Sequence, residues 1–172
     1  INNYDPKRLA SIFREYGEEK HAYKIANEID IKRQAKPIKT TLELVEIIDR
    51  CYPYKEKRHS HPAKKVFQAL RIEVNNELEE LKTALESSLE LLKPGGRLVV
   101  ITFHSLEDRI CKNIFKENSN IPDLIKGMPN IPENMLPDYK IITNKPILPS
   151  EEEMKINKRS KSAKLRVIER IK

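Results

Sequence analysis

The sequence predicts an α/β fold, and more narrowly the second half of an α/β enzyme. The stretch from Arg97 to Phe103 is apolar with almost no alternation, which is typical of a strand covered on both faces, as in a parallel sheet. Amphipathic helical patterns precede and follow this strand. Only two other stretches predict strands, so the central strand lacks neighbours. We therefore expect further strand and helix units to lie outside these 172 residues.

Three short amphipathic helices are predicted first. Asp5 is the expected N-cap of the first helix, and Pro6 occupies its first position. The second helix carries apolar residues at helical spacing and ends before Pro37. Thr40 and Glu43 have the spacing of a capping box at the start of the third helix. Together these patterns predict a small helical unit.

A long helical segment is predicted over residues 62–92. Apolar residues recur along it at steps of three or four, but Asn75 and Asn76 favour a bend or break because asparagine is a poor interior helix residue. We expect this segment to join a helical domain, residues 1–61, to a domain that holds the strands, residues 93–172.

A helix and a long loop are predicted after the first strand. Ser105 and Asp108 have a spacing like that of a capping box, so Ser105 is the expected N-cap of this helix. Prolines recur between residues 118 and 138, which predicts an extended loop.

Two more strands are predicted near the C-terminus. The first covers residues 139–143, and the second covers residues 164–171 after a short helix that Ser150 caps. Alternation in the last strand places three apolar residues on one face. They are Leu165, Val167 and Ile171.

Charge and composition exclude several classes of protein. Lys and Arg number 33 against 26 Asp and Glu, and the net charge of +7 favours a nucleic-acid partner. No apolar stretch reaches the ~18 to 20 residues of a membrane-spanning helix, so a membrane protein is excluded. Cys51 and Cys111 are too far apart for a CxxC site, which indicates a reducing, cytoplasmic location. HExxH and acidic calcium-loop spacings are absent, so no metal site is expected.

The segment from Phe103 to Arg109 is the leading candidate for a site. It follows the carboxyl end of the buried strand, where ligands bind in open α/β sheets, and it begins with the polar residues His104 and Ser105. A purely structural role for this segment is an equally good interpretation. Ser105 would cap the helix, and the negative charges of Glu107 and Asp108 would be stabilised by its positive N-terminus.

The C-terminal stretch from Lys155 to Lys172 is strongly basic, with Glu169 as its single acid after the short helix. Such a run is usually a solvated face, but in a basic chain it also suits the phosphate backbone of RNA or DNA. The candidate phosphate contacts are Lys158, Arg159, Lys161, Lys164 and Arg166.

Several strings resemble the ribosomal RNA small subunit methyltransferase H (MraW) family, and the resemblance extends over essentially the whole chain. They include HPAKKVFQALRI from residue 61, PGGRLVVITFHSLEDRI from residue 94 and RSKSAKLRVIERI from residue 159. The opening DPKRLASIFREYGEEKHAYKIANEI is similar to the start of the family's helical insert.

The resemblance implies methyl transfer from S-adenosylmethionine to the exocyclic N4 of a cytidine in 16S rRNA, within the small ribosomal subunit. It implies a class I (Rossmann-like) methyltransferase sheet with a helical insert domain that helps to hold the RNA. This chain corresponds to the insert and the C-terminal part of the catalytic domain, and the N-terminal half is absent. It begins with Ile1 rather than Met, which also suggests a piece of a longer protein.

The resemblance also implies where the functional residues lie. The glycine-rich loop that binds S-adenosylmethionine is expected upstream of Ile1, so we expect no residue of this chain to bind the cofactor. The few glycines here form neither GxGxxG nor a P-loop. His104 and Ser105 match the family's FHS motif and are our catalytic candidates, as groups that hydrogen-bond the target cytosine or its backbone. Three further candidates for RNA binding match its FQALR motif. They are Phe67, Gln68 and Arg71.

Two other functions stay open on the sequence alone. The positive charge also suits a basic RNA-binding or ribosome-associated helical module without enzymatic activity. The amphipathic helices suit a protein-interaction unit, although the basic C-terminal stretch does not favour it.

Overall fold

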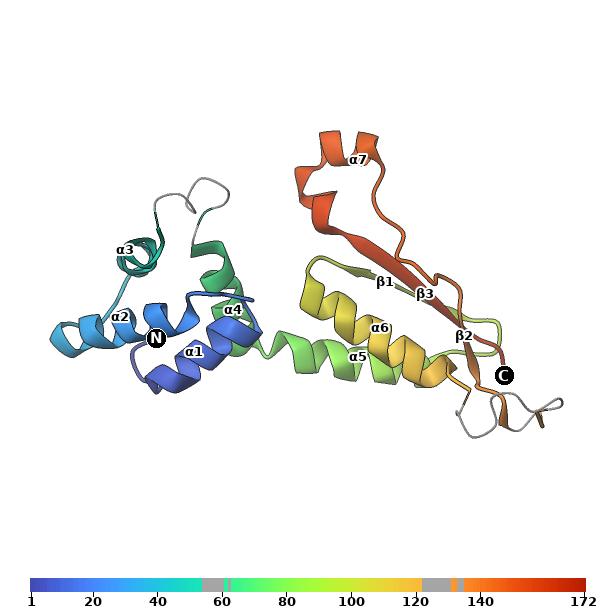
Figure 1. Cartoon of the computed structure of the whole chain (residues 1–172). Helices are drawn as coiled ribbons and strands as arrows, with labels where there is room; N and C mark the ends of the chain where they lie inside the picture. The colour runs from blue at the N-terminus through green and yellow to red at the C-terminus, as the bar shows by residue number, and fades with distance from the viewer. Residues whose placement is uncertain (54–60, 62, 122–130, 133–134) are drawn as a thin grey trace. The chain divides into compact units, whose positions relative to one another are not determined.

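The computed structural model describes residues 1–53, 61, 63–121, 131–132 and 135–172 (Figure 1). The chain divides into two compact units, Ile1–Glu77 and Leu78–Lys172. The start of the predicted long helix at residue 62 and much of the predicted loop between residues 118 and 138 lie outside the described residues. The division into three segments stays a prediction.

The first unit is helical. Asp5 caps its first helix by accepting a hydrogen bond from the Lys7 N–H at 2.8 Å. Thr40 and Glu43 form the predicted capping box: Thr40 Oγ1 accepts from the Glu43 N–H at 3.2 Å, and the Glu43 carboxylate accepts from the Thr40 N–H at 2.9 Å. The helices are α1 (Pro6–Glu15), α2 (Ala22–Ala35), α3 (Thr41–Cys51) and α4 (Ala63–Asn75).

The apolar stripes of these four helices meet in one core. Its largest fully buried side chains are Leu9, Ile12, Phe13, Ile25, Ile29, Ile48 and Val66. Gly17 follows α1, and a Cβ at this position would lie 2.7 Å from the Lys65 carbonyl oxygen at the start of α4. The glycine therefore permits a close backbone approach between α1 and α4.

The long helical segment is broken at Asn76. This residue has φ +52°, in the left-handed region that asparagine tolerates, and separates α4 from α5 (Glu77–Leu91). Arg71 binds the Glu77 carboxylate with two hydrogen bonds, of 2.7 and 2.9 Å, across the break. Val74 is 80% exposed, so the apolar face is not continuous as its spacing suggested.

The second unit combines helices with a small sheet. Its sheet has the order β1-β3-β2, and every pairing is antiparallel. The expectation of a parallel sheet is therefore wrong for the described strands, because β3 returns between the other two. After α5, the elements are β1 (Arg97–Thr102), α6 (Ser105–Ser119), β2 (Tyr139–Ile141), α7 (Glu151–Ile156), the 3-10 helix η3 (Lys158–Ser162) and β3 (Lys164–Arg170).

One face of this sheet is packed and the other is open. Helices α5 and α6 lie along the same face (Figure 1) and bury a core around Leu89, Phe115 and Ile168. On the opposite face Val99 and Ile101 are each 54% exposed. Within the described residues β1 is covered on one face only, and on the other face Ile101 lines a cavity.

The last strand follows the same division of faces. Arg166 and Ile168 are buried on the helix side, whereas Leu165 lines a cavity on the open side. The sequence pattern predicts that Leu165, Val167 and Ile171 share one face of this strand. The apolar residue of β3 that is buried in the core is instead Ile168.

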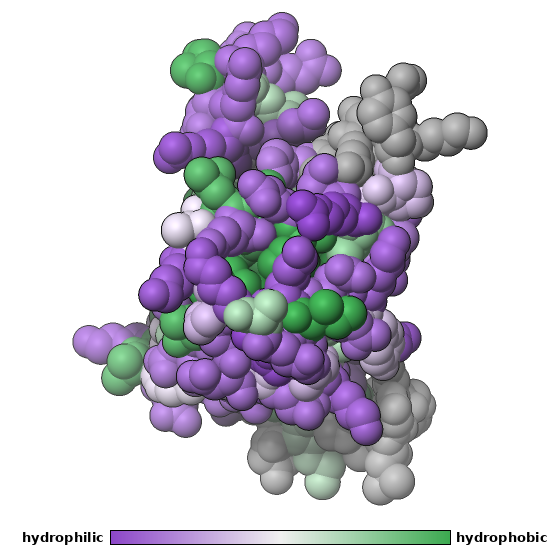
Figure 2. Space-filling model, turned by 90° about the vertical axis from the view of Figure 1, so that its left-hand side faces the viewer, coloured by the Kyte–Doolittle hydropathy of each residue, from purple (hydrophilic) through white to green (hydrophobic). Residues whose placement is uncertain are grey.

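The surface agrees with the polar composition. On the face drawn in Figure 2, hydrophilic residues predominate around small hydrophobic patches. None of the described helices is long and apolar enough to cross a membrane.

The Glu43 cap predicts acid sensitivity of the first unit. Hydrogen bonds from the N–H groups of Lys39 and Thr40 lower the pKa of this carboxyl from 4.5 to about 2. Because the folded-state pKa is depressed, its stabilisation is present above pH 4.5 and is lost as the pH falls toward about 2. Glu43→Gln should therefore reduce the free energy of unfolding near neutral pH and have a shrinking effect below pH 4.5.

Chemical denaturation at a series of pH values measures this difference. Glu46→Gln is the matched control, since it removes the same charge from α3 without touching the cap. An effect of Glu43→Gln that is the same at pH 6 and pH 2.5 would contradict the role of the cap.

Candidate functional site

Two segments that are far apart in sequence meet at one end of the sheet. Thr102, the last residue of β1, pairs with Lys164, the first residue of β3. This register brings the FHS segment (residues 103–105), which follows β1, next to the basic segment (residues 158–162), which precedes β3. The carboxyl end of β1 is the end at which ligands bind in open α/β sheets.

His104 caps α6. Its Nδ1 accepts a hydrogen bond from the Glu107 N–H at 3.4 Å, and the Glu107 carboxylate accepts from the N–H groups of Phe103, at 2.7 Å, and His104, at 3.3 Å. The expectation that Ser105 caps the helix with Asp108 is therefore wrong. Ser105 is the first helical residue, and the box is shifted by one position because histidine takes a place that usually holds Ser, Thr, Asp or Asn.

The imidazole of His104 is held against a carboxylate. Because Nδ1 accepts a hydrogen bond, the proton of the neutral ring lies on Nε2. That atom is buried without an aligned hydrogen-bond partner among the described residues, although Glu107 Oε1 lies 3.1 Å away. Burial raises the pKa of the Glu107 carboxyl, but the His104 side chain and the Phe103 N–H more than offset this effect and lower it. Glu107 therefore presents a negative charge to the ring.

Asp108 joins α6 to β3. Its Oδ1 accepts from Arg166 Nε at 2.7 Å, and its Oδ2 accepts from Arg166 Nη2 and Lys164 Nζ, each at 3.2 Å. The hydrogen bonds from Arg166 lower the pKa of this carboxyl despite its burial. Arg166 is buried, and Lys164 is half-buried. The side chain of Arg166 is therefore committed to Asp108 rather than displayed on the surface.

The other basic candidates lie on η3. Asn157 caps this short helix by accepting from the Arg159 N–H at 3.1 Å, and buried Ser160 donates to the Asn157 carbonyl at 2.8 Å. Lys158, Arg159 and Lys161 are all exposed. The turn thus displays three cations from a fixed backbone.

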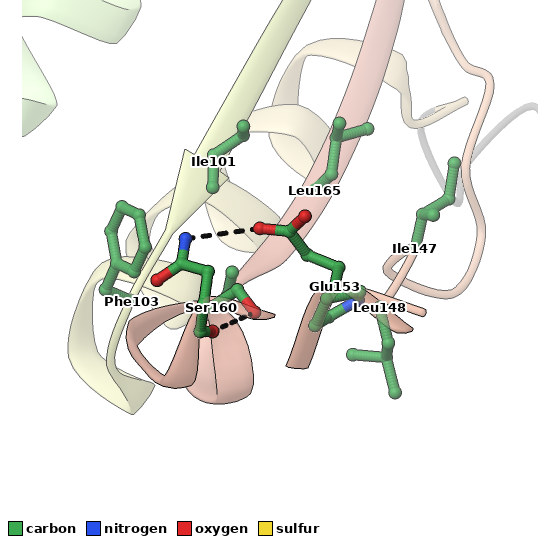
Figure 3. Close-up of a pocket in the computed structure, with 10 residues that line it drawn as sticks. Ile101, Phe103, Ile147, Leu148, Glu153, Ser160 and Leu165 are labelled. Carbon is green, nitrogen blue, oxygen red and sulfur yellow. Dashed lines mark hydrogen bonds between the residues drawn. The ribbon is translucent and has the colours of Figure 1, made fainter. Parts of the chain in front are cut away.

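A cavity of about 300 Å³ opens beside these segments, on the uncovered face of the sheet. Figure 3 shows its apolar side chains around a polar end, where Asn157 Nδ2 donates to Glu153 Oε1 at 3.2 Å. Phe103 lines it, one residue before His104. Its other apolar walls are Ile101, Ile147, Leu148 and Leu165.

The polar pair of this cavity, Glu153 and Asn157, is not predicted by any motif of the sequence. The predicted cap by Ser150 is confirmed, because its hydroxyl accepts a hydrogen bond from the Glu153 N–H at 3.1 Å, but the place of the Glu153 carboxylate in the cavity follows from no local pattern. Asn157 carried no signal at all. Its capping role shows only once η3 is seen, since a 3-10 helix has no distinctive periodicity.

The candidates in the first unit have internal partners. Phe67 packs partly buried against the helical core, and Gln68 donates to the Tyr16 carbonyl at 3.1 Å. Arg71 binds Glu77 across the break at Asn76. Each side chain thus has a structural contact within this unit.

The buried thiol Cys111 and the glycine turn before β1 have structural surroundings. Burial raises the pKa of the Cys111 thiol to about 11, so it is protonated and a poor nucleophile. Within residues 1–53, 61, 63–121, 131–132 and 135–172, no group of three or more His, Cys, Asp or Glu side chains is placed to hold a metal ion. Gly95, with φ +82°, donates its N–H to the Arg170 carbonyl in a turn. Gly95 therefore shapes a turn.

Comparison with known proteins agrees with these motifs. A curated relative, the ribosomal RNA small subunit methyltransferase H of Limosilactobacillus fermentum, is 53% identical over 173 residues. The match covers 100% of this chain and 55% of the relative, so the chain spans about half the length of the curated relative it matches. The family model of the MraW methylases matches residues 1–171. The resemblance is thereby confirmed, and the chain belongs to the MraW methylase family.

Proposed function

We propose that this chain is part of a cytoplasmic enzyme that transfers a methyl group from S-adenosylmethionine to N4 of a cytidine in 16S rRNA of the small ribosomal subunit. The observation that carries the proposal is the meeting of the FHS segment and the basic segment at the carboxyl end of β1. The polar residues His104 and Ser105 lie near the exposed cations of η3. This arrangement suits a nucleotide of RNA, whose base would contact the polar residues while the cations bind the phosphate backbone.

His104 and Ser105 are proposed to orient the target base. Methylation of an exocyclic amine needs its lone pair aligned with the methyl donor and a group that accepts or polarises its proton. The Ser105 hydroxyl is exposed and makes no hydrogen bond within the described residues. His104 is held by Glu107, which fixes the orientation of its ring through contacts at both ring nitrogens.

The donor is proposed to bind to residues outside positions 1–172, because the described glycines serve turns and close packing. The free edge of β1 would then pair with further strands of a class I methyltransferase sheet, and other elements would cover its open face. Val99 and Ile101 are apolar and exposed on that face, as expected of side chains that other elements cover.

RNA is proposed to contact both units. Lys158, Arg159 and Lys161 supply phosphate contacts in the second unit, with a smaller share from Lys164. Arg166 is not part of this exposed surface, because it is buried and binds Asp108 through Nε and Nη2. The helical unit around α4 is proposed as the substrate-recognition domain, to which Phe67, Gln68 and Arg71 belong.

Methyl transfer to rRNA is the direct test. The full-length protein should add a labelled methyl group to unmethylated small subunits, and digestion with mass spectrometry should find it as N4-methylcytidine. Residues 1–172 alone should be inactive and should not bind S-adenosylmethionine in calorimetry. Methylation at another atom would contradict the proposed reaction, and micromolar binding by residues 1–172 would contradict the proposed location of the donor.

Variants at the FHS segment should separate chemistry from capping. In the full-length protein, His104→Asn keeps a side chain that caps well and should lower the single-turnover rate about 100-fold through loss of the imidazole. His104→Ala should also cost about 0.5 to 2 kcal/mol in the free energy of unfolding, through loss of the cap. Ser105→Ala should slow transfer while changing that free energy by less than about 0.5 kcal/mol. A wild-type rate for His104→Asn would leave His104 with a structural role only.

Neutralising η3 should weaken the salt dependence of RNA binding. Lys158→Gln with Lys161→Gln removes two proposed phosphate contacts and should reduce the slope of log K against log salt by about 1.5. The matched control is Lys82→Gln with Lys93→Gln, which removes the same charge from exposed positions of the second unit. Equal slopes for the two double variants would show that η3 is an ordinary solvated surface.

A further inference from the structure

A second cavity in the same unit has a different character. It has a volume of about 220 Å³ and lies between α6 and the segment that follows β2. Its lining includes the cations Lys112 and Lys116 of α6 and Arg166 of β3, together with the polar residues Thr143 and Asn144. We call this cavity the α6 groove.

The α6 groove has no carboxylate in its lining. The other three cavities described in the two units each include at least one glutamate, at Glu153, at Glu43 and Glu46, or at Glu18 and Glu19. Glu117 follows Lys116 directly on α6 but does not line the groove. Arg166 is paired with Asp108, but Lys112 and Lys116 have no counter-charge among the described residues of the wall, and their two positive charges favour an anionic ligand.

The two lysines of the groove are available to a ligand. Lys112 and Lys116 lie one helical turn apart, are exposed and form no ion pair within the described residues. Like charges at this spacing destabilise an isolated helix. Lys116 lies in the last turn, where the helix dipole favours a cation, but Lys112 lies outside that turn. The dipole therefore does not account for the pair.

The wall of the groove also has unused hydrogen-bond donors. Arg166 binds Asp108 through Nε and Nη2, and its Nη1 makes no hydrogen bond within the described residues, although the side chain is only 9% exposed. Thr143 Oγ1 accepts from the Val167 N–H at 2.8 Å, so its own O–H remains a donor. Donors from a buried guanidinium and a fixed hydroxyl suit an oxyanion.

The size of the groove limits the ligand. Pockets for whole cofactors or drug-sized molecules are about 300 to 1,000 Å³. A volume of about 220 Å³ suits a single phosphoryl group rather than a nucleoside. The buried floor residue Phe115 belongs to the core of this unit, so no base stacks on an exposed ring there.

We propose that the α6 groove binds one phosphodiester group of the RNA substrate, as a contact separate from η3. The proposal rests on the proposed function, since it takes rRNA as the ligand. Lys112 and Lys116 supply charge to the two free phosphate oxygens, and Arg166 Nη1 and the Thr143 hydroxyl donate hydrogen bonds from the wall. Inorganic phosphate offers the same chemistry and is the alternative source.

The first test compares double variants of the full-length protein. Lys112→Gln with Lys116→Gln should weaken binding to small-subunit rRNA about tenfold and reduce the slope of log K against log salt by about 1.5. Lys82→Gln with Lys93→Gln removes the same charge elsewhere in the unit and should change affinity less than threefold. Equal losses for both pairs would overturn the proposal, because a general charge effect would then explain them.

Methyl transfer distinguishes failure of the groove from failure of the proposed function. If the wild-type protein methylates rRNA but both double variants bind it equally, the groove is wrong and the function stands. If the wild-type protein does not methylate rRNA while the groove variant alone loses RNA affinity, the function is wrong and the groove remains a phosphate site. Unfolding midpoints close to that of the wild type establish that each variant is folded.

The second test identifies the source of the phosphate. Titration of the full-length protein with inorganic phosphate, followed by NMR, should shift the amide signals of Thr143 and Asn144, and rRNA should displace the bound phosphate. Saturation by phosphate that rRNA does not displace would overturn the RNA assignment in favour of a small anion. The absence of any shift at these two residues, with either ligand, would overturn the site itself.

Discussion

The carboxylate of Asp108 fixes the arrangement on which the second unit depends. It accepts hydrogen bonds from Arg166 and Lys164, and so holds the start of α6 against the start of β3. The FHS segment precedes α6 and the basic segment precedes β3, so one acid determines how the two motifs face each other. A partly buried carboxylate is costly unless it is paired, and Arg166 and Lys164 both pair with Asp108 here.

What could be predicted from sequence follows from how local each interaction is. The caps at Asp5 and at Thr40 with Glu43 depend on residues within one helical turn, and both are confirmed. The strand near Arg97 is also confirmed, but its antiparallel partner depends on a contact with β3, some 70 residues later, which no local pattern contains. At the site, the segments themselves were identified, whereas the cap by His104 was missed because histidine is an unusual N-cap.

The number of basic residues in the sequence does not show which of them are exposed and unpaired at the surface. Lys158, Arg159 and Lys161 are exposed as a solvated or ligand-binding face requires, but Arg166 is buried with its charge used by Asp108. Arginine suits this position because its planar fork binds a carboxylate at two points. The lysines of α6 were not singled out, because their relation to Thr143 and Asn144 exists only in three dimensions. Burial and partners, rather than the number of cations, decide which of them a phosphate can reach.

The uncovered side of β1 has a consequence for handling residues 1–172 as a separate polypeptide. In the described sheet β1 is an edge strand, and its sequence RLVVIT carries a single charge, at Arg97. Natural edge strands avoid intermolecular pairing through lysine, proline, bulges or short length. The other edge, β2, is only three residues long, but β1 has six residues and an exposed apolar face. Self-association of the isolated polypeptide would therefore begin at β1, through strand addition between copies.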